Sequence, residues 1–155
     1  MTPFEIIQEH HFLDWATLLA GLERGWCTKE DVVKYAENQL LKSNSEIDTR
    51  LIGIINSEQT SYLELISQIQ DFLHHPEIEK KESNSALLKW RFAFITSLLE
   101  KETSEQEKIA LLQEIYSQFG YPEDMISCSV YHNDGIDPLV AAQKVVDLLR
   151  KNLEK

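Results

Sequence analysis

One stretch restricts the possible folds of this chain more than any other: residues 86–101, ALLKWRFAFITSLLEK. Apolar side chains occupy nearly every side of a helix built from this stretch: Leu87, Leu88, Trp90, Phe92, Phe94, Ile95, Leu98 and Leu99. A helix with one face in water would instead carry a polar stripe along that face. We therefore predict a central helix over residues 86–101, with neighbouring elements on at least two of its sides.

Most of the remaining chain also has helical periodicity. Apolar residues recur at i, i+3, i+4 and i+7 in segments that begin at Trp15, Val32, Ile47, Tyr62, Ile109 and Ala142. Helix starts are predicted at the N-cap candidates Asp14, Thr28, Ser104 and Asp137, and helix ends at Gly25 and Gly120. A polar, charged run at residues 74–85 predicts an exposed connection. The five glycines and four prolines are too few for the turns of an all-β sandwich.

These patterns predict a single all-α domain over residues 1–155. It is expected to be a bundle of about seven amphipathic helices around the hydrophobic helix at residues 86–101. A chain of 155 residues is long enough to bury one real core. Residues 126–133 are the exception. Val130 and Tyr131 favour extended backbone and precede an Asn-Asp-Gly turn signal, so a short extended segment is an alternative to helix there.

The charge of the chain restricts its partners. The formal net charge is −11 at pH 7. Nucleic acids and anionic membranes are bound through basic surfaces, so neither is expected as a partner, whereas a basic protein is. The chain has no long apolar run and no basic leader followed by an apolar stretch, which predicts a cytoplasmic protein.

The motifs of common enzymes and metal sites are missing. The sequence has no glycine-rich phosphate loop, no G-x-S-x-G and no H-E-x-x-H. The adjacent histidines at 10–11 and 74–75 cannot both face one ion from a regular helix. Cys27 and Cys128 are expected to be buried, inert thiols, although His132 has i, i+4 spacing to Cys128 and could form a dyad. No catalytic residue, cofactor or metal is predicted.

Acidic residues concentrate in the last third of the chain. Residues 102–137 contain eight acidic residues and only one basic residue, Lys108. Some of these acids are expected to cap helices or to keep an outer face soluble. Others lie in connections beside tyrosines, which is typical of protein-binding surfaces. The predicted partner-binding residues are Tyr121, Glu123, Asp124, Tyr131 and Asp134.

Three stretches together resemble a bacterial family of unknown function. They are GWCTKEDVVKYAENQL near the start, LLKWRFAFITSLLEK in the middle and EIYSQFGYPEDM after it. The resemblance covers roughly residues 12–155 and departs from the family pattern after Met125. Proteins of this kind are similar to immunity proteins of contact-dependent growth inhibition and polymorphic toxin systems. The resemblance implies an inhibitor that binds a cognate toxin inside the producing cell.

These observations lead to one functional hypothesis and two alternatives. The hypothesis is an immunity protein that neutralises a basic bacterial toxin, a nuclease, by covering its active site with the acidic surface. A helical adaptor between proteins is the first alternative, although no period of 33 to 47 residues repeats in the sequence. An enzyme with an unrecognised site is the second. We predict a protein without enzymatic activity.

Overall fold

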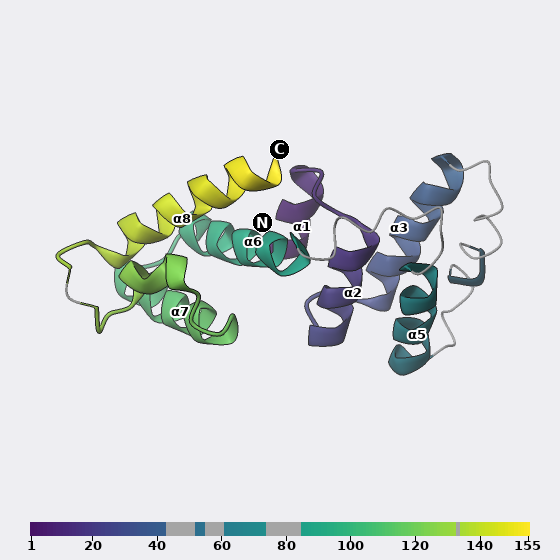
Figure 1. Cartoon of the computed structure of the whole chain (residues 1–155), viewed down its shortest axis with the longest axis horizontal. Helices are drawn as coiled ribbons and strands as arrows, with labels where there is room; N and C mark the ends of the chain where they lie inside the picture. Colours follow the sequence, from purple (N-terminus) through teal and green to yellow (C-terminus); the bar gives the residue numbers. More distant parts are fainter. Residues whose placement is uncertain (43–51, 55–60, 74–84, 133) are drawn as a thin grey trace. The chain divides into compact units, whose positions relative to one another are not determined.

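A computed structural model describes residues 1–42, 52–54, 61–73, 85–132 and 134–155 (Figure 1). All regular structure in these ranges is helical and none is strand, which confirms the all-α fold class. The connection predicted at residues 74–85 lies outside the described residues except for Ser85. The same holds for most of the segment expected to begin at Ile47, of which residues 52–54 are described and helical. Every helix in the described ranges is too short or too polar to cross a lipid bilayer.

The described residues form two compact units. Unit 1 comprises Met1–Phe12 and Leu87–Lys155, and unit 2 comprises Leu13–Ala86. The sequence-based expectation of one domain over residues 1–155 stays a prediction.

Besides the helical residues 52–54, the described part of unit 2 contains the helices α2 (Trp15–Arg24), α3 (Lys29–Lys42) and α5 (Tyr62–Leu73). Trp15 joins them, because its ring lies 4.9 Å from that of Tyr35 on α3 and 4.7 Å from that of Phe72 on α5. The Asp14 carboxylate accepts a hydrogen bond from the amide of Thr17, as the predicted N-cap requires. Burial of the Trp15 ring therefore fixes this small core.

Unit 1 contains α1 (Pro3–Glu9), α6 (Ala86–Glu100), α7 (Glu105–Gln118), the 3-10 helix η3 (Glu123–Cys128) and α8 (Pro138–Leu153). Five consecutive residues of α6, residues 89–93, are buried. Phe92 receives ring contacts from His10 and Phe12 at 5.0 and 5.6 Å, and Phe94 contacts Phe119 at 6.0 Å. Other elements thus pack on more than one side of α6, which confirms the prediction that this helix has neighbours on at least two of its sides.

The possible extended segment at residues 126–133 is not present in the described part of that stretch. Residues 126–128 complete η3, residues 129–131 form a bend and a turn, and residue 133 lies outside the described ranges. The physical reason is that Met125 and Cys128 are fully buried. Side chains three positions apart point the same way from a 3-10 helix, whereas neighbouring side chains of a strand alternate.

Candidate protein-binding surface

The predicted binding residues all lie in the connection between α7 and α8, which Figure 1 shows as the light-green stretch of unit 1. Gln113 of α7 ties this connection to the helix. Its Nε2 donates to the carbonyl of Cys128 at 2.9 Å, and its Oε1 accepts from the amide of Val130 at 3.2 Å. One side chain therefore satisfies two backbone groups of the connection and fixes its course.

Asp124 is bound to a buried arginine. The guanidinium of Arg91 on α6 donates to both carboxylate oxygens of Asp124, at 2.5 and 3.0 Å. The Arg91 side chain is only 7% exposed, whereas that of Asp124 is 45% exposed. Because a buried guanidinium is costly without a counter-charge, the main role of Asp124 is to neutralise Arg91. The pair also anchors η3 to α6.

Asp134 folds the connection back on η3. Its carboxylate accepts from the hydroxyl of Ser127 at 2.5 Å and from the amide of Ile136 at 3.0 Å, and it lies 3.2 Å from Nε2 of His132. The hydrogen bond from Ser127 is the largest cause of a lowered pKa for Asp134, followed by that from Ile136. These bonds favour the ionised form, so Asp134 is held as a carboxylate.

Exposed apolar side chains are the main feature of this connection that the sequence pattern did not predict. Tyr131 is 94% exposed, and Ile126 and Val130 are each 50% exposed. Tyr121 at 62% and Ile136 at 40% continue the series, as does Val140 in the first turn of α8 at 51%. We call these six residues together with Glu123 and Asp134 the η3 surface. Exposed apolar side chains that lie together on a surface mark interaction sites, and these six follow one another within residues 121–140.

Tyr121 stands out among the predicted residues by its backbone conformation, and Glu123 stands out among the predicted acids by its lack of a bonding partner in the described structure. Tyr121 has a positive φ of 57°, which is rare for a residue with a bulky side chain. Its ring packs edge-on against Tyr116 at 5.1 Å, and its hydroxyl lies 3.2 Å from that of Ser117. The carboxylate of Glu123 has no hydrogen bond or ion pair within the described ranges and remains open to a partner.

The five predicted residues therefore fall into two groups. Tyr121, Glu123 and Tyr131 are exposed, although the ring and hydroxyl of Tyr121 already contact Tyr116 and Ser117 of α7. Asp124 and Asp134 are engaged within the chain. Sequence reasoning missed Arg91, although a lone arginine inside a buried helix is a signal that an acidic partner must exist.

The alternative dyad of Cys128 and His132 is disfavoured by the burial of the Cys128 thiol. Cys128 is fully buried, and burial raises its pKa to about 11. Cys27 is also buried, with a pKa raised to about 12, chiefly by the same effect. Both thiols are protonated at neutral pH, as expected for inert cysteines. Three or more His, Cys, Asp or Glu side chains arranged to hold a metal ion do not occur in the described part of the chain.

A family model matches residues 4–155. Its description reads "Uncharacterized protein conserved in bacteria (DUF2247)". The chain belongs to this family. The match confirms the resemblance to a bacterial family of unknown function, and the description names neither a toxin nor an immunity role. The curated proteins and the solved structures gave no match.

Proposed function

We propose that this DUF2247 protein is an immunity protein, an inhibitor that binds a basic toxin protein and covers its active site. The observation that carries the proposal is the η3 surface, in which exposed tyrosines and aliphatic residues share one stretch of the chain with the free carboxylate of Glu123. Aromatic anchors supply much of the affinity of protein interfaces, while complementary charge raises the association rate. A nuclease fits this role, because its active-site groove is built to attract phosphate.

The internal bonds of the connection support the proposal in a second way. Gln113, the Arg91–Asp124 pair and the Ser127–Asp134 hydrogen bond fix the backbone before any partner arrives. A segment ordered in advance loses less conformational entropy on binding. The η3 surface is therefore suited to tight binding without rearrangement.

The η3 surface also supports a second candidate, a general protein adaptor. Two of the three predicted carboxylates are engaged inside the chain, so the available surface is more apolar than acidic. An apolar anchor such as Tyr131 serves a partner that is not a nuclease equally well. Whether the bound partner loses a catalytic activity distinguishes the two candidates.

The test begins with the gene immediately upstream, which the immunity role predicts to encode a large secreted protein with a toxic C-terminal domain; a neighbouring gene of another kind would count against that role. We expect that domain to arrest growth when expressed in a bacterial host, and co-expression of the present chain to restore growth. With purified proteins, Tyr131→Ala should weaken binding about tenfold or more, as for an interface anchor. Glu123→Lys should slow association and reduce its dependence on salt.

The matched control is Tyr62→Ala on α5, since Tyr62 is a tyrosine of unit 2 that is 46% exposed. It should leave the affinity unchanged. Asp124 is left intact, because its replacement would release Arg91 and confound a loss of binding with a loss of folding. If growth is not restored, the immunity role is wrong. If growth is restored but Tyr131→Ala binds as tightly as the wild type, the interface lies elsewhere.

A further inference from the structure

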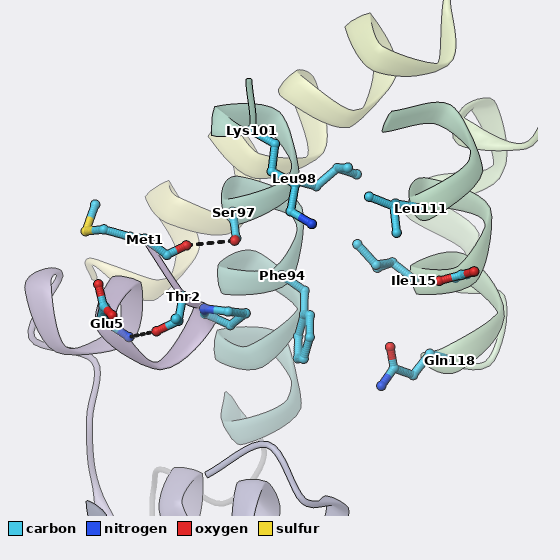
Figure 2. A pocket seen from close by; sticks show the side chains of 12 residues that line it. Met1, Thr2, Glu5, Phe94, Ser97, Leu98, Lys101, Leu111, Ile115 and Gln118 are labelled. Carbon is cyan, nitrogen blue, oxygen red and sulfur yellow. Dashed lines mark hydrogen bonds between the residues drawn. The ribbon is translucent and has the colours of Figure 1, made fainter. Parts of the chain in front are cut away.

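Unit 1 has a pocket of about 680 Å³ that is separate from the η3 surface. The start of α1, one side of α6 and one side of α7 enclose it. Its walls are apolar, because Phe94 and Leu98 of α6 face Leu111 and Ile115 of α7 across the space (Figure 2). Pockets of this size with mostly apolar walls and a few polar groups are typical small-molecule sites.

The polar groups of the pocket differ in their availability. The hydroxyl of Ser97 donates to the carbonyl of Met1 at 2.8 Å, so its hydrogen is already used. In Figure 2 the Lys101 side chain turns toward the space between Leu98 and Leu111. The Lys101 ammonium has no ion pair or hydrogen bond to another described residue. It is the charged group best placed to meet a ligand.

The dimensions of the pocket favour an elongated ligand. Phe94 and Lys101 lie seven positions apart, which is about 10 Å along a helix axis. A molecule with its charged end at Lys101 would extend its apolar body over Leu98 and Leu111 toward Phe94. Glu5, Glu114 and Gln118 also line the pocket, and the two carboxylates oppose a negative charge placed near them, so the ligand can carry one carboxylate at Lys101 and no second anionic group.

We propose that this pocket binds a small monocarboxylic acid with a medium-length apolar chain, its carboxylate paired with Lys101. The net charge of −11 does not prevent this, because at physiological salt charges more than about 8 Å away are largely screened. The proposal concerns unit 1 alone. It does not depend on the toxin-binding role, which uses other residues.

Titration calorimetry with decanoate below its micellar concentration tests the proposal. Decanoate should bind the full chain with one site per molecule and raise its melting temperature. Decyltrimethylammonium has the same chain with the opposite charge and should bind at least fivefold more weakly. Equal affinity for the two probes, or no binding of decanoate, would overturn the proposal.

Variants locate the site. Lys101→Gln should weaken decanoate binding up to about fivefold, the upper end of the range for exposed ion pairs, while Lys101→Arg should retain it. Leu111→Trp should fill the pocket and abolish binding, with the circular dichroism spectrum as the check of folding. Lys144→Gln on α8 is the matched control and should bind like the wild type. Decanoate that binds Lys101→Gln as tightly as the wild type would contradict the assignment.

Discussion

Two connections of the chain begin with the same helix-ending motif and then follow different paths to the next helix. The α2–α3 connection and the α7–α8 connection both start at a left-handed glycine, Gly25 with φ 75° and Gly120 with φ 76°. An aromatic residue follows each glycine, and its amide bonds back to a carbonyl five residues earlier: Trp26 to Gly21 at 2.7 Å, and Tyr121 to Tyr116 at 2.9 Å. Both have the hydrogen bond of a Schellman helix end.

The first connection then closes at once. The amide of Thr28 donates to the carboxylate of Asp31, and the amide of Asp31 donates to the hydroxyl of Thr28, so α3 starts with a capping box. The second connection instead inserts η3 and a turn before Asp137 caps α8. The extra residues bury Met125 and Cys128 but leave Ile126, Val130 and Tyr131 in solvent. A longer connection thus adds an exposed surface to the same helix stop.

The largest expected effect on stability comes from breaking the Arg91–Asp124 ion pair, which has no counterpart in the first connection. Asp124→Ala leaves Arg91 buried without its counter-charge and should lower the free energy of unfolding by about 2 kcal/mol. This is below the range for a fully buried pair, because Asp124 is partly exposed. Urea unfolding would measure the loss. Glu123→Ala on the same 3-10 helix is the control and should change stability by less than about 0.5 kcal/mol.

A double-mutant cycle would sharpen that result. Arg91→Met removes the cation, so adding Asp124→Ala to it should cost much less than Asp124→Ala alone. Equal costs in both backgrounds would show that the pair contributes no coupling.

Replacing Gly25 or Gly120 with alanine should have a smaller effect on the free energy of unfolding, and the effect should be equal in the two connections. A Cβ built at Gly25 or Gly120 meets no atom within 4 Å, so the positive φ is the only obstacle to alanine. Gly25→Ala and Gly120→Ala should each lower the free energy of unfolding by about 1 kcal/mol. Gly53 also has free space but no positive φ, and Gly53→Ala should not destabilise the protein. Unequal losses at Gly25 and Gly120 would contradict the likeness of the two helix ends.

The smallest effect is the pH dependence that Asp134 gives to the second connection. Its pKa is lowered in the folded protein from the ordinary 3.8, so its stabilising effect is present above 3.8. That effect is lost as the pH falls through the lowered pKa. Asp134→Asn should therefore be less stable than the wild type at pH 7, and the difference should shrink under strongly acidic conditions.

Melting temperatures measured from pH 7 to pH 2 would show this convergence. Glu123→Gln is the control, because its carboxylate makes no hydrogen bond in the described structure that the substitution would remove. A stability difference between Asp134→Asn and the wild type that stays constant down to pH 2 would show that the carboxylate charge is unimportant.

The sequence predicted the local structure of these regions well because local rules govern it. Asp14, Ser104 and Asp137 cap their helices, and Gly25 and Gly120 end theirs, as expected from residue type and position. The all-round hydrophobicity of residues 86–101 likewise predicted a buried helix. Each of these signals acts within a few residues and needs no knowledge of distant contacts.

The candidate site could be predicted only in part. The stretch from Tyr121 to Asp134 was identified from its acids and tyrosines, but the availability of each side chain was not. Asp124 pairs with Arg91, which lies 33 positions away, and no local pattern links the two. The exposure of Val130 and Ile126 was also missed, because apolar residues usually point inward.

The amino-acid sequence by itself determined that the chain is helical, where its capped helices begin and end, and that α6 is enclosed. These properties follow from hydrophobic periodicity and from backbone conformations that particular residues favour. Only the tertiary structure decided which carboxylates are free, which apolar side chains face solvent and where a pocket lies. Those properties depend on which segments, distant in the sequence, pack against each other, because that packing determines which side chains are buried and which charges are paired.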